Sequence, residues 1–185
     1  LASNYSLSSG TFDVTVKNVT FVGSRVYDGT TSVNSSNISS TFTGLAGSET
    51  LTLSGSGSVA SKNVASGQSV TIGSIAIANG TGVASNYSLT SATLNITQRP
   101  ISLSGTRVYD ATTTASSSDL TTFANLVGSE TLVLSNSGTV SNANVGTDKT
   151  VTIGSLSLGN GSNGGLSSNY TLSGGTHTLS VTKRP

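Results

Sequence analysis

The sequence predicts an all-β protein in which one small module occurs in tandem. Three observations support this prediction: a long internal repeat, apolar residues that alternate with polar ones, and turn residues at intervals of about ten residues. Ser, Thr, Asn and Gly make up more than half of the chain. These residue types disfavour helix interiors, and no segment keeps the 3.6-residue period of a helix. Each module is therefore expected to be built from strands alone.

The internal repeat is the most informative feature of the chain. Residues 26–31, Val-Tyr-Asp-Gly-Thr-Thr, return 82 positions later as residues 108–113, Val-Tyr-Asp-Ala-Thr-Thr. Other matched segments follow in the same order: 47–53 with 128–134, 70–74 with 151–155, and the tetrad Asn-Tyr-Ser/Thr-Leu at Asn4, Asn86 and Asn169. A unit of this length is too long for one turn of a solenoid, which has roughly 20–45 residues. It suits a small domain that folds by itself and is joined to others in series.

Aligning the copies predicts the domain boundaries. Residues 1–17 are expected to be the C-terminal remnant of a preceding copy, residues 18–99 the first repeat, and residues 100–185 the second repeat. No Gly/Ser-rich linker separates the two full copies. Because Pro100 restricts Arg99 to extended conformations, the junction is expected to be stiff. Stiff junctions in series predict an elongated rod.

Within a repeat, the apolar positions predict the strands and one break between them. In residues 70–77, apolar side chains occupy even positions up to Ile72 and odd positions from Ile75 onward, and residues 151–158 show the same change. A β-bulge or a sheet corner at residues 73–74 and 154–155 would restore the inward face. The expected fold class is thus all-β, with tandem small β-sandwich-like modules whose arrangement is either immunoglobulin-like or β-grasp-like.

The composition excludes several classes of function. Only 8% of residues are charged, the net charge is +1, and the eight Lys and Arg residues are scattered, so we expect no nucleic-acid partner. No run of 18 apolar residues occurs, so we expect no membrane insertion. The absence of Cys removes disulfides and thiol chemistry. No cofactor is expected either.

The repeated acidic residues could have two roles. Asp28 and Asp110 occupy matching turns, and each carboxylate is expected to accept backbone N–H groups from the threonines that follow, as in an Asx-turn. The alternative is calcium binding together with Glu49 or Glu130. Calcium needs six to eight oxygen ligands, and the seven carboxylates of the chain are dispersed, so no metal site is expected.

The five tyrosines all fall at repeated positions: Tyr5, Tyr27, Tyr87, Tyr109 and Tyr170. We expect them to be core aromatics whose hydroxyls reach a backbone partner at a sheet edge. A platform for stacking carbohydrate is the alternative. His177 is the only histidine and is expected to be a solvent-exposed strand residue. Since no positioned base accompanies any serine, the sequence predicts no enzymatic activity.

The ordered series of motifs resembles the YDG repeat found in large bacterial surface adhesins of the filamentous-haemagglutinin type. The resemblance is carried by residues 26–31, 62–64, 67–71 and 86–89, and by their counterparts in the second copy. The repeat-motif residues are Tyr27, Asp28, Asn86 and Tyr87 in the first copy, and Tyr109, Asp110, Asn169 and Tyr170 in the second. Ala111 replaces the glycine after the aspartate, which suggests a turn that does not strictly need a positive φ.

The resemblance implies a function and a location. It indicates structural stalk or spacer repeats of an extracellular bacterial adhesin, which present a distal binding region at the cell surface in adhesion or biofilm formation. The expected partners are neighbouring repeats of the same polypeptide. Two alternatives stay open: a module that binds glycan or polysaccharide, and a repeat that associates with copies of itself into filaments.

Overall fold

The computed structural model describes residues 9–185. In this part of the chain the regular structure consists of strands and two short 3-10 turns, without an α-helix, so the all-β prediction is confirmed. Asn4 and Tyr5, which the sequence predicted to be motif residues of a preceding copy, lie outside the described residues.

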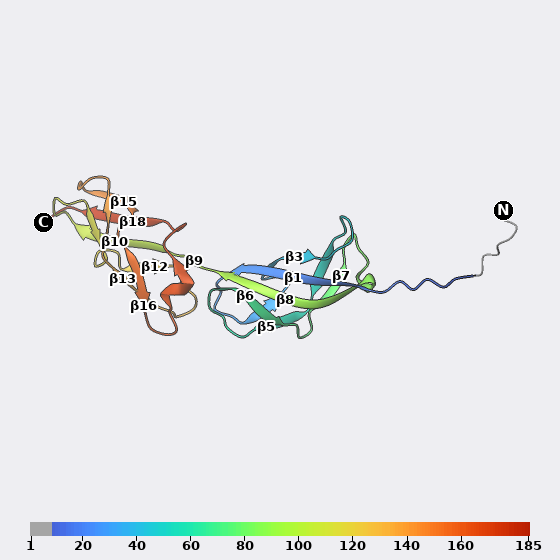
Figure 1. The fold of residues 1–185 in the computed structure, drawn as a ribbon. Coiled ribbons are helices and arrows are strands. Elements are labelled where there is room, and N and C mark those ends of the chain that lie inside the picture. The colour runs from blue at the N-terminus through green and yellow to red at the C-terminus, as the bar shows by residue number, and fades with distance from the viewer. Residues whose placement is uncertain (1–8) are drawn as a thin grey trace.

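The strands fall into two similar groups that follow one another along the chain (Figure 1). The first repeat contains β1 (Lys17–Val26), β2 (Ser32–Asn34), β3 (Ser39–Thr43), β4 (Leu51–Ser54), β5 (Ser56–Val59), β6 (Ala65–Thr71), β7 (Ala76–Asn79), the 3-10 turn η2 (Ala84–Asn86) and β8 (Tyr87–Thr97). The second repeat contains β9 (Arg99–Pro100), β10 (Ser102–Val108), β11 (Thr114–Ser116), β12 (Thr122–Ala124), β13 (Leu132–Ser135), β14 (Ser137–Val140), β15 (Gly146–Thr152), β16 (Ser157–Asn160), the 3-10 turn η3 (Ser167–Asn169), β17 (Tyr170–Thr171) and β18 (His177–Thr182).

Each repeat forms one curled six-stranded sheet and one two-stranded ribbon, and the second repeat also contains the short strand pair β17-β9. The sheet has the order β2-β5-β6-β8-β1-β3 in the first repeat and β11-β14-β15-β18-β10-β12 in the second, while the ribbons are β4-β7 and β13-β16. The long strands at the start and end of each repeat, β1 with β8 and β10 with β18, run parallel to each other, and the other pairs in these sheets and ribbons are antiparallel. The immunoglobulin-like and β-grasp-like sandwiches, and the elongated rod, stay predictions.

The core lies on the inner face of these long strands. In β1 the exposed fraction alternates, and Val19 and Phe21 are each 1% exposed, since successive side chains of a strand point to opposite faces. The paired strand β8 contributes Leu94 and Ile96 to the same interior. The parallel pair of long strands therefore contributes several of the buried core side chains of the first repeat. In the first repeat this pair ends next to the segment that leads into the second repeat.

The change of parity at residues 73–74 is a sheet corner. The chain leaves the six-stranded sheet at Thr71 and enters the ribbon at Ala76, and Gly73 has a φ of 57°. A Cβ atom at this glycine would lie 2.7 Å from the carbonyl oxygen of Ser56, so both the positive φ and the close approach require glycine. Gly154 repeats this geometry with a φ of 56°. One of the two predicted alternatives, the sheet corner, is confirmed.

The two repeats differ in their last strand. The first repeat has one continuous strand, β8, whereas in the second repeat residues 172–176 separate β17 from β18. His177 begins β18, is only 4% exposed, and its Nε2 lies 2.9 Å from the carbonyl oxygen of Leu172. The prediction that His177 is solvent-exposed was wrong. In the first repeat Ala92 pairs with Phe21 and faces inward, and His177 pairs with Leu103 at the equivalent position, so it faces inward too.

The junction between the repeats consists of strand residues rather than a free linker. After β8 ends at Thr97, β9 pairs in parallel with β17, and the backbone N–H of Ile101 donates to the carbonyl of Thr171 over 3.0 Å. Ile101 is completely buried. The connecting segment is thus held by the second repeat along nearly its whole length.

Candidate interface between the repeats

The loop after β1 places the first repeated tyrosine at the junction. The backbone N–H of Tyr27 donates to the carbonyl of Thr97 over 2.9 Å, which ties the end of β1 to the end of β8. The carboxylate of Asp28 accepts the backbone N–H of Thr30 over 3.0 Å, and Gly29 between them has a φ of 76°. The predicted Asx-turn is confirmed, and its effect is to fix the backbone beside Tyr27.

The second repeat contains the same turn. The backbone N–H of Thr112 donates to Asp110 over 3.0 Å. This backbone hydrogen bond lowers the pKa of the Asp110 carboxyl, and the guanidinium of Arg107 acts in the same direction. Ala111 has a φ of 64°, so the expectation that its turn does not need a positive φ was wrong. The Asx-turn holds this backbone in the left-handed region although the residue is alanine.

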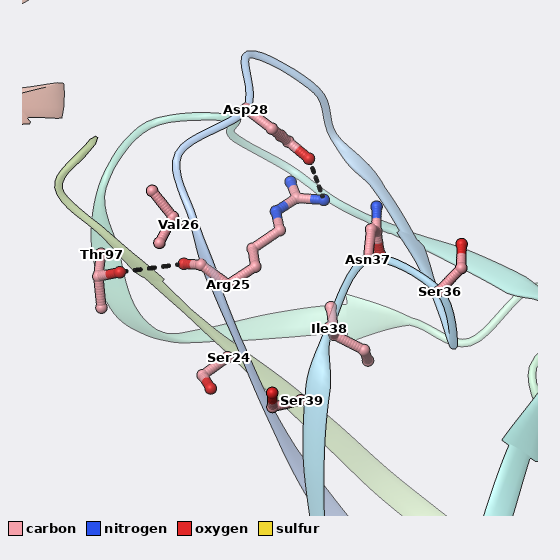
Figure 2. A pocket seen from close by; sticks show the side chains of 9 residues that line it. All are labelled: Ser24, Arg25, Val26, Asp28, Ser36, Asn37, Ile38, Ser39 and Thr97. Carbon is pink, nitrogen blue, oxygen red and sulfur yellow. Dashed lines mark hydrogen bonds and ion pairs between the residues drawn. The ribbon is translucent and has the colours of Figure 1, made fainter. Parts of the chain in front are cut away.

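A buried arginine supports each loop, as Figure 2 shows for the first repeat. The guanidinium of Arg25 lies below the loop, 3.4 Å from the Asp28 carboxylate, and donates to the carbonyls of Thr30 and Ser32. Its side chain is 3% exposed. Arg107 occupies the same place in the second repeat and is 9% exposed. Sequence reasoning missed these residues, although an arginine stands two positions before the motif tyrosine in both copies.

The hollow beside this loop is a weak candidate for ligand binding. It has a volume of about 530 Å³ and is lined by Ser24, Arg25, Val26, Asp28, Ser36, Asn37, Ile38, Ser39 and Thr97 (Figure 2). The charge of Arg25 is already engaged by Asp28 and by two backbone carbonyls. The hollow therefore offers no free charge, and the arginine is better explained as the support of the loop.

Tyr27 reaches across the junction into the second repeat. Its side chain is completely buried, and its hydroxyl donates to Glu130 Oε1 over 2.7 Å. Its ring packs edge-on against that of Tyr170, with centroids 5.5 Å apart and an interplanar angle of 79°. Such a T-shaped pair is favourable beyond the area that it buries. The motif tyrosine of one repeat thus completes the core at the start of the next.

Glu130 is the centre of the contact. It is 6% exposed and accepts a second hydrogen bond, from the Tyr170 hydroxyl to Oε2 over 2.7 Å. Lys62, from the first repeat, donates to Oε1 over 2.9 Å, and its ammonium lies 5.9 Å from the centroid of the Tyr27 ring. We refer to Tyr27, Lys62, Glu130 and Tyr170 as the Tyr–Glu cluster. A buried carboxylate with this many donors is well satisfied.

The hydrogen bonds within the Tyr–Glu cluster shift the pKa values of its members. Burial alone would raise the pKa of Glu130, but hydrogen bonds from Tyr170, Lys62 and Tyr27 outweigh it and hold the pKa below its ordinary value of 4.5. Burial, reinforced by the hydrogen bonds to Glu130, raises the pKa of both tyrosines. The hydrogen bond to Glu130 raises the pKa of Lys62. The cluster is therefore expected to hold one carboxylate, one ammonium and two neutral phenols at neutral pH.

Asn169 adds a second cross-repeat contact. Its side chain is completely buried; Oδ1 accepts the backbone N–H of Val64 over 2.9 Å, and Nδ2 donates to Asn63 Oδ1 over 3.0 Å. The side chain thus satisfies backbone and side-chain groups of the first repeat. Asn86, its counterpart, is exposed. The asparagine of the Asn-Tyr motif therefore forms a contact between repeats in the second copy, whereas in the first copy it forms none with the described residues.

The connecting segment contributes the remaining contacts. Arg99 donates to the carbonyl of Tyr27 over 3.3 Å and to the carbonyl of Asn125 over 2.6 Å, so it bridges the two repeats. Gln98 donates to the carbonyl of Ser168 over 3.2 Å. These three hydrogen bonds tie the connecting segment to both repeats.

The first repeat contains an equivalent tyrosine–glutamate pair, Tyr87 and Glu49. Tyr87 is 7% exposed, donates its hydroxyl to Glu49 Oε2, and accepts the backbone N–H of Ala46 over 3.1 Å. Tyr170 accepts the backbone N–H of Val127 in the same way over 3.0 Å. Each repeat thus presents a Tyr-Glu pair at its start.

The outcome for the predicted tyrosines is mixed. Tyr27, Tyr87 and Tyr170 are core residues as predicted, and the hydroxyls of Tyr87 and Tyr170 each accept a backbone N–H as predicted. All three hydroxyls also donate to a carboxylate, which was not predicted. Tyr109 is 38% exposed and does not belong to the core of its own repeat. Sequence reasoning considered Glu130 only as a calcium ligand. The signal that could have identified its role is that glutamate and tyrosine recur together in both copies.

Two further observations concern other classes of site. Among residues 9–185, no cluster of three or more His, Cys, Asp or Glu side chains could hold a metal ion. Within the same residues, no helix is long and apolar enough to cross a membrane.

Comparison with known proteins identifies the family. Neither the curated proteins nor the solved structures contain a significant match to this chain. The family model of the YDG domain matches twice, at residues 11–96 and at residues 92–178, and so covers most of the chain. With two matches in tandem and the repeated Tyr-Asp motif at the end of the first strand of each copy, this chain belongs to the YDG domain family.

Proposed function

We propose that this chain is a structural spacer in an extracellular bacterial adhesin, in which YDG repeats follow one another as an elongated rod of small β-sandwich-like modules. The spacer holds a distal binding region away from the cell in adhesion or biofilm formation. The adhesin role and the extracellular location rest on the resemblance of the motifs to repeats of such proteins. The domain boundaries at residues 17/18 and 99/100 belong to the same proposal.

One observation supports a mechanical role most directly: a hydrogen-bonded cluster around the buried Glu130 joins the two repeats. The Tyr–Glu cluster draws two residues from each repeat, and the bridging Arg99 adds two more hydrogen bonds. A flexible tether between domains needs no such contact, whereas a satisfied network of buried hydrogen bonds favours one relative arrangement of its members. Buried tyrosines at the junction are expected in a chain whose role is to hold its repeats in one relative arrangement.

Residues 9–16 fit the same interpretation. Phe12 and Val14 are 89% and 85% exposed and belong to no strand. They lie 82 positions before Leu94 and Ile96, and those two residues are buried in the final strand of the first repeat. We propose that residues 1–17 are the C-terminal remnant of a preceding repeat, whose other residues would cover these apolar side chains.

The burial of the tyrosines argues against the glycan-binding alternative. A stacking platform must expose aromatic faces, and among the tyrosines in residues 9–185 only Tyr109 does so. On a glycan array, the purified chain is expected to bind no carbohydrate. Binding that survives the Tyr109→Ala change would favour a lectin-like role at another site.

The location can be tested on cells. Antibodies raised against the purified chain are expected to label intact bacteria that express the parent protein, without permeabilisation. Labelling that requires permeabilised cells would contradict an extracellular spacer. A strain that lacks the parent gene provides the matched control for antibody specificity.

A further inference from the structure

One loop of the second repeat contains two residues that the first repeat lacks. The first repeat has Asn-Gly-Thr-Gly at residues 79–82, and the second has Asn-Gly-Ser-Asn-Gly-Gly at residues 160–165. In each copy the glycine after the first asparagine donates its backbone N–H to the last glycine of this stretch, over 3.2 Å in the first repeat and 2.9 Å in the second. The same hydrogen bond thus closes both loops, and the additional residues are Asn163 and Gly164.

We propose that Asn163 is a site of spontaneous deamidation that the fold selects. In this reaction the backbone nitrogen of Gly164 attacks Cγ of Asn163 and forms a cyclic succinimide. The side-chain NH2 group leaves as ammonia and takes the proton of the attacking nitrogen. Water then opens the ring, and the product is aspartate or isoaspartate. The overall change is the uptake of water and the release of ammonia, so the reaction needs no oxidant or cofactor.

The backbone nitrogen of Gly164 is accessible for this attack. Within residues 9–185 its N–H donates no hydrogen bond, and glycine has no Cβ atom that could shield the nitrogen. Asn163 and Gly164 are both exposed, and neither belongs to a strand. Rotation of this backbone toward the asparagine side chain therefore breaks no hydrogen bond of a sheet.

The other two Asn-Gly pairs of the sequence are protected by the fold. Asn79 ends β7 and Asn160 ends β16, and each of them pairs with a residue of the neighbouring strand. Their Oδ1 atoms accept the backbone N–H groups of Ala84 and Ser167, each over 2.8 Å. The glycine nitrogen that follows each asparagine already donates the hydrogen bond that closes its loop. Attack at either pair therefore requires these hydrogen bonds to open first.

The reactive pair lies beside the Tyr–Glu cluster. Nδ2 of Asn163 donates to the carbonyl of Ser129 over 3.0 Å, and Ser129 immediately precedes Glu130 in the chain. A Cβ atom placed on Gly164 would lie 3.8 Å from Glu130 Oε1 and 3.8 Å from Lys62 Nζ. A change of charge or of backbone length at this loop therefore reaches the groups that join the two repeats.

Deamidation weakens the contacts on this side of the junction. The product has a carboxylate in place of the amide, and a carboxylate cannot donate a hydrogen bond to the carbonyl of Ser129. It also adds a negative charge near Glu130, and a second carboxylate disfavours the ionised form of the first. Isoaspartate lengthens the backbone as well and displaces Gly164. The junction between the repeats thus changes with the age of the protein.

Timed peptide mapping of the folded chain in heavy-oxygen water tests the inference. The new carboxyl takes its oxygen from the water, so the isotope marks only the deamidation that occurs during the incubation, and fragment spectra assign it to Asn160 or Asn163. Asn163 is expected to react on the order of tenfold faster than Asn79 or Asn160, because each protected pair must first open two hydrogen bonds. In urea the three rates should converge, since all three pairs are then unfolded Asn-Gly sequences.

Two outcomes would overturn the inference: equal rates at the three pairs in the folded chain, or the same preference for Asn163 in urea, because the fold would then not be its cause. The control Asn163→Gln keeps the amide on a longer side chain that forms a ring far more slowly. It is expected to abolish the reaction at this position and to leave the rates at Asn79 and Asn160 unchanged.

The effect on the junction is tested with Asn163→Asp and its matched control Asn160→Asp. Both variants add a carboxylate to the same loop, but Asn160→Asp keeps an acceptor for the backbone N–H of Ser167. Asn163→Asp is expected to unfold at a lower urea concentration than the wild type, and Asn160→Asp should stay close to the wild type. The reverse order would contradict an effect through Ser129. The proposed function is judged separately, because the deamidation rates depend only on this loop and not on the role of the repeats.

Discussion

Tyr27 and Tyr109 occupy the same position in two repeats with the same order of strands in the main sheet, yet one is fully buried and the other is 38% exposed. Their own repeats hold them in the same way, through one backbone hydrogen bond to the last strand. The difference arises because Tyr27 has a neighbouring repeat to enter. The motif tyrosine is therefore an interface residue, and its burial depends on the repeat that follows and not on the repeat that contains it.

The same comparison holds for the acidic partner. Glu130 accepts hydrogen bonds from Tyr27, Lys62 and Tyr170, whereas Glu49 has only the tyrosine of its own repeat among the residues described. Since the local structures match, the two copies provide an internal control. A change at an inner position measures the interface, and the equivalent change at an outer position measures the repeat alone.

The largest difference is expected for the motif tyrosines. Tyr27→Ala removes a buried aromatic ring and should lower the free energy of unfolding by about 3–5 kcal/mol. Tyr109→Ala should cost less than about 1 kcal/mol, since much of its ring contacts solvent. Urea denaturation of both variants provides the measurement. Equal costs would show that the tyrosine stabilises its own repeat.

The next largest difference is expected for the glutamates. Glu130→Ala leaves Tyr27 and Tyr170 with buried hydroxyls that lack their acceptor, which should cost about 2–4 kcal/mol. Glu49→Ala affects only Tyr87 and should cost about half as much. Thermal unfolding followed by calorimetry measures both. In Glu130→Ala the two repeats are also expected to unfold in separate steps, and a single unchanged transition would contradict the coupling.

The interface is also expected to depend on pH. Because the pKa of Glu130 is lower in the folded protein than its ordinary value of 4.5, its contribution is present above about pH 4.5 and is lost as the pH falls through the folded pKa. The pKa values of Tyr27 and Lys62 are raised from 10.0 and 10.5, so their contributions are present below that range and are lost as the pH rises above it. Denaturation between pH 3 and pH 7 should show a loss of stability at the acid end. The loss should be smaller in Glu130→Gln, and an equal loss would assign it to other carboxylates.

The smallest difference is expected for the lysine. Lys62 is 38% exposed, so solvent screens its ion pair with Glu130, and Lys62→Ala should cost only about 0.5–1 kcal/mol. The cost should decrease further at high salt. Lys149→Ala is the matched control, because the ammonium of this lysine donates hydrogen bonds to Asn142 and Asn144 of its own repeat. A cost above that of Glu130→Ala would contradict the proposed hierarchy of contacts.

Local features of this fold could be predicted from the sequence because each depends on residues that lie close together in the chain. The alternation of apolar residues predicted the strands, the change of parity before Ile75 predicted the sheet corner, and the residues after Asp28 predicted the Asx-turn. In each case the cause and its effect lie within a few residues. The predicted exposure of His177 was wrong because this residue occupies the inward-facing position that Ala92 has in the first repeat.

The interface could not be predicted in the same way. Tyr27 and Glu130 are 103 residues apart, and each also has an equivalent in the other copy, so the sequence alone does not say whether the pair forms within a repeat or between repeats. Ala111 shows the related difficulty for the backbone. Its positive φ is set by the hydrogen bond to Asp110 and not by its own residue type.

Small-angle X-ray scattering of the wild type and of Tyr27→Ala tests most directly whether the Tyr–Glu cluster holds the two repeats in a fixed arrangement. We expect a wild-type curve that one in-line arrangement of the repeats reproduces at all concentrations where the chain is monomeric. The variant should need an ensemble of bent arrangements, and Tyr109→Ala should scatter as the wild type does. A wild type that hinges as freely as Tyr27→Ala would contradict the account.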